Sequence, residues 1–98
     1  MTEDAAWQAL AALRTEIDAI DLRIVGLLNE RARIAEKIGD TKQCGGLPVV
    51  EPAREQKVIE KVCGMNGGPL TDAAVQAIYE KIMLEMRQIQ FVRMQGQG

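Results

Sequence analysis

Histidine is absent from this 98-residue sequence, which removes the commonest general base and the usual side-chain ligand of transition metals. Aromatic residues are scarce, with one Trp, one Tyr and one Phe, so a hydrophobic core must be built from aliphatic side chains and methionine. Such a composition favours helices. No apolar run approaches the roughly 18 residues of a membrane span, and we expect no association with a membrane.

Cysteine is limited to Cys44 and Cys63, which have neither a metal-ligand spacing nor histidine nearby. We therefore expect two reduced thiols, no secretory leader, a cytoplasmic location and no metal site. The sequence also has no large excess of positive or negative charge, because 12 basic and 14 acidic residues give a net charge of −2. Nucleic acids select strongly basic surfaces, so no nucleic-acid partner is expected.

Hydrophobic periodicity predicts an all-α fold with three helices in a single domain, residues 1–98. The first helix is expected to run from about Asp4 to Thr41 and to end before the loop signal CGGLP at 44–48. Gly39 lies within it and costs about 1 kcal/mol relative to alanine, which permits a kink. We nevertheless expect one continuous helix.

The second helix is predicted to start at Pro52, a favourable first helical residue, and to stop near Gly64. Residues 65–69 form a turn signal, and Thr71 is expected to cap a third helix. The tail 95–98 is expected to be frayed. The side chains expected to face inward are Val58, Ile59 and Val62 in the second helix and Val75, Ile78, Ile82, Met86 and Ile89 in the third.

The first helix carries an apolar stripe that is too long for a compact monomer to cover. Its positions step by three and four residues, at 10, 13, 17, 20, 24, 27, 31, 34 and 38. A helix of about 38 residues is roughly 57 Å long, whereas a compact domain of this size has a radius of gyration near 13 Å. We therefore expect a second chain to cover the stripe in an intertwined homodimer.

Arg31 is the one charged residue in that stripe. A guanidinium there needs an anionic partner, either inside the protein or on a ligand. Lys42 follows eleven residues later on nearly the same helix face, so both side chains could reach one small anion. Alternatively, Glu55 on the inward face of the second helix, with Arg54 beside it, would neutralise Arg31 in a buried ion pair.

Two further polar residues complete the candidates. Gln90 follows Met86 by four residues and is therefore expected at the edge of the core. Arg14 is seventeen residues before Arg31, about 25 Å by helix rise, too far for one small ligand to touch both in the same chain. In an antiparallel dimer, Arg14 of one chain would lie beside the Arg31 to Lys42 region of the other.

Five sequence blocks occur in a specific order and spacing, from about Leu10 to Gln90. They are LRTEIDAID at 13–21, LLNER at 27–31, IGDTK at 38–42, PVVEPARE at 48–55, and Gln90. Together they resemble the AroQ-type, all-helical chorismate mutases. The resemblance implies a three-helix protomer in a domain-swapped homodimer with two shared active sites. It also implies an isomerase that converts chorismate to prephenate in aromatic amino acid biosynthesis, on the shikimate pathway.

The resemblance assigns roles to the cations and to one amide. Arg31 and the partner subunit's Arg14 would hold the two carboxylates of chorismate, while Lys42 and Gln90 would lie at the ether oxygen of the breaking bond. The rearrangement is unimolecular and pericyclic, so no nucleophile, metal or cofactor is implied. The cations would stay unneutralised until the dicarboxylate binds.

The remaining implied contacts lie on the second and third helices. Glu55 would accept a hydrogen bond from the ring hydroxyl of chorismate, Arg54 would support the carboxylate end, and Glu51 would line the pocket. Met86 departs from the family pattern, because many relatives carry a small, often polar residue there. The departure bears on the shape of the pocket rather than on its charges.

Three other functions stay open at this point. A lyase of the same fold would release pyruvate from isochorismate with a similar cationic site. A non-catalytic domain would bind chorismate or prephenate and regulate an aromatic-pathway enzyme, which would then be a protein partner. A purely structural coiled coil would give Arg31 no ligand at all.

Overall fold

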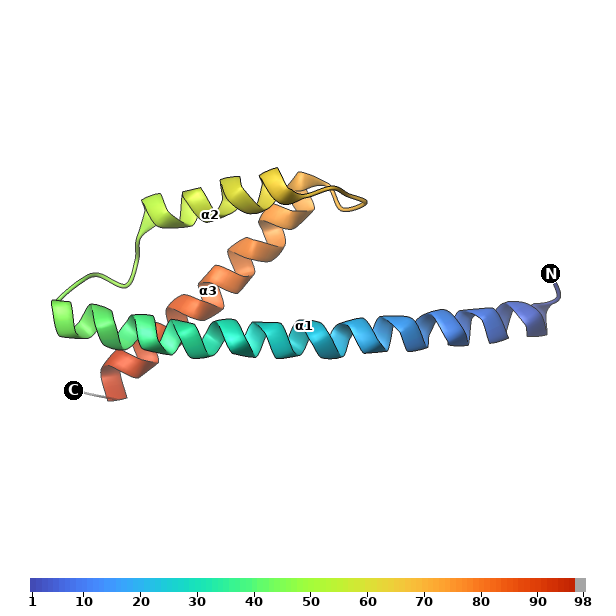
Figure 1. The fold of residues 1–98 in the computed structure, drawn as a ribbon, viewed down its shortest axis with the longest axis horizontal. Coiled ribbons are helices and arrows are strands. Elements are labelled where there is room, and N and C mark those ends of the chain that lie inside the picture. Colours follow the sequence, from blue (N-terminus) through green and yellow to red (C-terminus); the bar gives the residue numbers. More distant parts are fainter. Residues whose placement is uncertain (97–98) are drawn as a thin grey trace. The chain divides into compact units, whose positions relative to one another are not determined.

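The computed structural model describes residues 1–96, and their fold is all-α, as expected. Three helices follow one another along the chain: α1 (Glu3–Gly45), α2 (Pro52–Met65) and α3 (Asp72–Gly96) (Figure 1). No strand occurs within residues 1–96. None of the described helices is long and apolar enough to cross a membrane.

Helix α1 is continuous through Gly39, as predicted, but it ends at Gly45, four residues later than expected. Gly46 adopts a left-handed φ of 67°, and Leu47 donates its backbone N–H to the carbonyl oxygen of Lys42 at 2.7 Å. This is the Schellman arrangement, which favours glycine at the left-handed position because glycine has no Cβ to clash. The glycines at 45 and 46 therefore complete and cap the helix, and the loop begins only after them.

Helices α2 and α3 begin where the sequence predicts. Pro52 is the first residue of α2, and the hydroxyl oxygen of Thr71 accepts a hydrogen bond of 3.1 Å from the backbone N–H of Ala74 at the start of α3. The expectation of a frayed tail was wrong for Gln95 and Gly96, which are helical. Residues 97 and 98 lie outside the described part of the chain.

The chain divides into two units, and α1 contributes to both. The first unit, Met1–Arg31, consists of the N-terminal part of α1 alone. Its stripe is largely exposed in this single chain, with exposed fractions of 56% for Leu13, 56% for Ile17 and 61% for Leu27. A lone helix has no second element against which to bury such a face.

The second unit starts at Ala32 and contains the end of α1 together with α2 and α3, which pack against one another. Its buried apolar side chains are Ala35, Val49, Ile59, Met83 and Met86. The expectation for Ile78 was wrong, because this side chain is 49% exposed. The other side chains expected inside on α2 and α3 are half-buried: Val58, Val62, Val75, Ile82 and Ile89.

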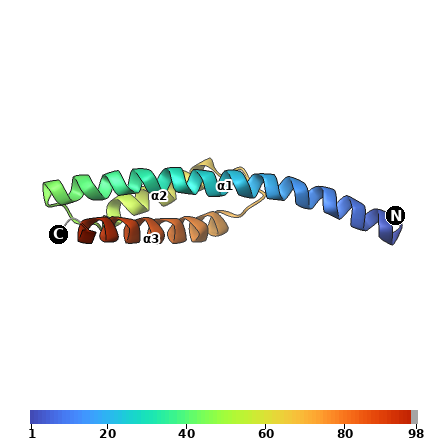
Figure 2. The same ribbon diagram turned by 90° about the horizontal axis from the view of Figure 1, so that it is seen from below.

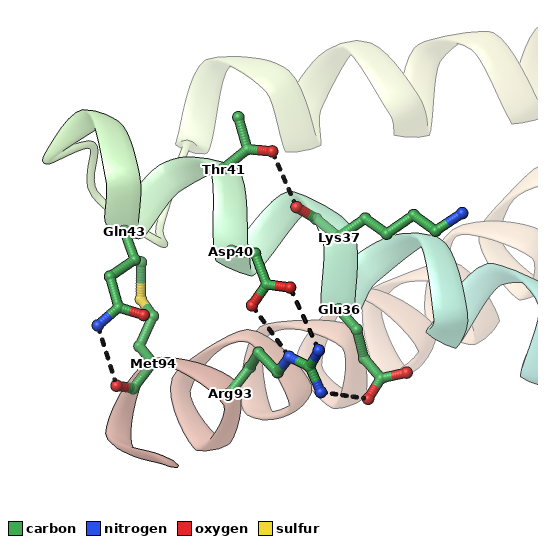
Figure 3. Close-up of polar contacts among 7 residues, drawn as sticks. All are labelled: Glu36, Lys37, Asp40, Thr41, Gln43, Arg93 and Met94. Carbon is green, nitrogen blue, oxygen red and sulfur yellow. Dashed lines mark hydrogen bonds and ion pairs between the residues drawn. The ribbon is translucent and has the colours of Figure 1, made fainter. Parts of the chain in front are cut away.

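Within the second unit, α3 lies beside the last turns of α1 (Figure 2). A Cβ placed on Gly39 would be only 3.2 Å from the Cα of Gln90, so a glycine lets the two backbones approach. Polar contacts tie the same two helices together (Figure 3). Arg93 donates to both carboxylate oxygens of Asp40, at 2.9 and 3.3 Å, and to Glu36 at 3.5 Å. The hydrogen bond and charge of Asp40 raise the pKa of Arg93.

We predict that Gly39→Ala will be less stable than Gly64→Ala, although both changes remove a glycine from a helix. A Cβ on Gly64 meets no atom within 4 Å, so the gain in helix propensity, up to about 1 kcal/mol, is retained. A Cβ on Gly39 pushes against the backbone of Gln90, which offsets that gain. Urea unfolding of both variants at one protein concentration measures the difference. Equal stabilisation by the two changes would contradict the close approach of α1 and α3.

Candidate functional site

Lys42, in the last turn of α1, is a buried cation with three protein acceptors. Its side-chain nitrogen Nζ lies 2.7 Å from the carbonyl oxygen of Val49, 3.0 Å from Oε1 of Gln90 and 3.2 Å from Oε2 of Glu51. The residue is only 7% exposed. Two of these contacts are hydrogen bonds and the third is an ion pair, and together they offset the cost of removing the charge from water. Lys42 is therefore not the solvated lysine that is common at helix ends.

The local fold brings these acceptors to Lys42 from two directions. The turn at Gly46 reverses the chain after α1, so the carbonyl of Val49 returns to the lysine seven residues earlier. Glu51 is the residue that precedes α2, but its carboxylate makes no capping bond to that helix. It forms the ion pair with Lys42 instead, and its side chain is 49% exposed.

Gln90 is the member of the cluster that α3 contributes, and its backbone lies close to Gly39 of α1. The residue is 8% exposed, so the prediction that it points to the edge of the core is confirmed. Because an ammonium only donates hydrogen bonds, the oxygen of the Gln90 amide must face Lys42. The nitrogen Nε2, which carries two N–H donors, therefore points away from the lysine.

A second ion pair joins α2 to α3. Arg87 donates through Nη1 to Oε1 of Glu55, and each side chain is 26% exposed. Glu55 follows Glu51 by four residues and Arg87 precedes Gln90 by three, spacings that place neighbours on one helix face. The Glu55–Arg87 pair is therefore about one helical turn along α2 and α3 from the Lys42 cluster.

The structure brings together several of the residues that the sequence singled out. Lys42, Gln90 and Glu51 are in contact. Glu55 is paired with Arg87. The expectation that the cations stay unneutralised is wrong for Lys42, because Glu51 already contacts it.

Of the other predicted residues, Met86 and Arg54 belong to the second unit, and Arg14 and Arg31 to the first. Met86 is buried, with 6% exposure, and Arg54 is exposed on α2. Arg14 is exposed and Arg31 is half-buried, both in the first unit. The site described above is built only from the second unit.

Sequence reasoning missed two members of the site. The carbonyl of Val49 could not be found from residue types, because its position depends on the path of the loop. Arg87 left a signal: it follows the buried Met83 by four residues and precedes Gln90 by three, so it shares their helix face. That spacing marks an arginine on the inner side of α3.

Metal-ligating side chains do not gather in the described part of the chain. No group of three or more Cys, Asp or Glu residues there could hold a metal ion. Cys44 and Cys63 are both free thiols. The chemistry available to the site is that of hydrogen-bond donors, cations and carboxylates.

Comparison with known proteins gives a consistent result. The sequence profile of the family "Chorismate mutase type II" matches residues 13–91. A bifunctional chorismate mutase/prephenate dehydratase of Aquifex aeolicus is 41% identical over 80 residues, which are 78% of this chain and 22% of that protein. An intracellular chorismate mutase of Mycobacterium bovis is 34% identical over 61 residues, 62% of this chain and 58% of that protein.

A solved structure has a similar fold. The chorismate mutase of Helicobacter pylori, crystallised in complex with prephenate, superimposes with a TM-score of 0.84 and 30% sequence identity. The match covers 90% of this chain and 96% of that one. By contrast, this chain spans about a fifth of the length of the Aquifex relative.

We predict that Lys42→Met will lower the free energy of unfolding by about 1–3 kcal/mol, because the buried oxygens of Val49 and Gln90 lose their donor. Glu51→Gln is the matched control. It removes only the half-exposed partner of Lys42 and should cost less than about 1 kcal/mol. Urea unfolding measures both values. A loss in the control as large as that in Lys42→Met would show that the Glu51 ion pair, rather than the buried hydrogen bonds, stabilises the cluster.

Proposed function

Because this chain belongs to the chorismate mutase type II family, we propose that it catalyses the rearrangement of chorismate to prephenate. The observation that carries the proposal is the contact between Lys42 and Gln90, two buried polar side chains joined at the junction of α1 and α3 by a hydrogen bond that the lysine donates to the amide oxygen. A purely structural helix pair has no need of such a contact, since burying polar groups costs free energy.

The chemistry of the rearrangement matches these donors. As the C–O bond of chorismate breaks, its ether oxygen gains negative charge, and a cation and an N–H group aimed at it stabilise the transition state. The Nε2 donors of Gln90 point away from Lys42 and would donate to that oxygen. Lys42 would donate to the ether oxygen in place of one of its present protein contacts. Glu51 is the contact that is most accessible to water. Losing one such donor typically costs about 3–4 kcal/mol of transition-state stabilisation.

The carboxylates of chorismate need further cations. We propose that Arg31 and the partner subunit's Arg14 bind them in bidentate pairs, with Arg54 in support. Such contacts hold the flexible substrate in its compact, reactive conformer. Glu55 would accept a hydrogen bond from the ring hydroxyl, while Glu51 and Met86 would line the pocket.

The exposed stripe of the first unit supports the participation of a partner subunit. Side chains such as Ile17, at 56% exposure, and Leu27, at 61%, form an apolar face that a monomer leaves in water. We propose that a second copy of the chain covers this face in an intertwined homodimer, so that each site receives Arg14 from the other subunit.

The proposal extends to the cellular setting. One relative is named an intracellular enzyme, which favours a cytoplasmic location for this chain. The Aquifex relative combines the mutase with a prephenate dehydratase in one protein. We therefore propose that the product passes to an enzyme that consumes prephenate, which makes an enzyme of the aromatic pathway the expected functional partner.

Turnover of chorismate by the purified 98-residue chain tests the proposed function. An ultraviolet assay follows the disappearance of chorismate, and a parallel assay offers isochorismate and detects pyruvate. Prephenate formation supports the proposal. Pyruvate release from isochorismate would identify the lyase instead, and tight binding of chorismate without turnover would identify a regulatory domain.

We predict that Gln90→Glu will be active only at acid pH. Above its pKa the introduced carboxyl is negative and repels the developing charge on the ether oxygen; below it, the group donates a hydrogen bond again. A glutamate has an ordinary pKa of about 4.3, so kcat should rise as the pH falls below about 5. The measurement is kcat from pH 4 to 8, with the wild type as control. Full activity of the variant at neutral pH would contradict the placement of Gln90.

We predict that inactive Arg14→Ala and inactive Lys42→Ala chains will complement each other when mixed. In a heterodimer of the two variants, one site carries both changes and the other carries neither. Random exchange should restore roughly a quarter of the wild-type activity. Circular dichroism confirms that both variants are folded before mixing. An inactive mixture that contains heterodimers would contradict a site shared between subunits.

A further inference from the structure

The ion pair between Arg87 and Glu55 differs from the other ion pairs of the described residues. Both of its side chains are about three-quarters buried, at 26% exposure each. Lys81 and Glu85, by comparison, are 68% and 57% exposed, and Arg93 and Asp40 are 46% and 35% exposed. Exposed pairs contribute little to stability, whereas removing one partner of a buried pair leaves an uncompensated charge.

The pair also lies next to the cluster proposed to hold the substrate. Glu51 immediately precedes α2 and Glu55 lies in its first turn, and Arg87 and Gln90 occupy neighbouring positions on one face of α3. Two carboxylates thus border the place where a dianion would bind. Each is matched by a cation, Glu51 by Lys42 and Glu55 by Arg87.

We infer that Arg87 is a positioning residue for the mutase reaction: it fixes the Glu55 carboxylate as an acceptor for the substrate hydroxyl and offsets its repulsion of the substrate carboxylates. The inference rests on the proposed function. Without Arg87, a half-buried carboxylate would face a dianion with no counter-charge, and its side chain would lose the bond that orients it. Glu55 alone is poorly suited to a site for a dicarboxylate, whereas the Glu55–Arg87 pair is neutral.

This role predicts an effect mainly on substrate binding. Arg87→Gln should raise the KM for chorismate about tenfold and lower kcat less than about threefold, because the repulsion acts on the bound substrate as well as on the transition state. Arg87→Lys keeps the charge and should restore most of the affinity. Lys81→Gln breaks an exposed pair on the same helix and should leave both constants unchanged.

A double-mutant cycle separates this role from a merely structural one. In a Glu55→Gln background no carboxylate needs a counter-charge, so adding Arg87→Gln should change KM less than about twofold. Circular dichroism melts establish that every variant is folded at the assay temperature. If the wild type is active, two results would overturn the role of Arg87 alone. One is a KM of Arg87→Gln equal to that of the wild type. The other is an equal rise in KM when Arg87→Gln is added to the wild type and to Glu55→Gln. A folded wild type without chorismate turnover would overturn the proposed function, and this inference with it.

Discussion

The burial of the Lys42 ammonium is the interaction on which the second unit depends. A charge that is 7% exposed must be matched by acceptors, and here they come from a loop carbonyl, a carboxylate at the start of α2 and an amide on α3. The same contacts therefore fix the path of the loop and the end of α3. The apolar core of this unit is small, so these polar contacts are a large part of what joins the helices.

Much of the fold could be predicted from local signals. Pro52 and Thr71 mark helix starts through backbone chemistry that acts within one turn, and both predictions are confirmed. The end of α1 was misjudged because glycines at 45 and 46 look like a loop, yet they form the helix cap. Ile78 was misplaced because periodicity finds an apolar face but not which part of it another helix covers.

The candidate site could be predicted only in part, for a related reason. Lys42 and Gln90 are identifiable because each interrupts or borders an apolar face, and the structure brings them into contact. The partner of Glu55 was not identifiable from α2 alone, because it depends on how α3 packs against that helix. The pairing of Lys42 with Glu51 likewise depends on the turn at Gly46. The subunit that supplies Arg14 stays a prediction.

The orientation of the Gln90 amide has a consequence for selectivity. Lys42 only donates hydrogen bonds, so the oxygen of this amide faces the lysine. The nitrogen on the other side of the amide offers N–H groups and no lone pair. Any ligand atom that meets this end must accept a hydrogen bond. An ether or carbonyl oxygen satisfies it, whereas an ammonium group would place hydrogen against hydrogen. An otherwise isosteric protonated amine is thus disfavoured by the polarity of a single side chain, without any steric barrier.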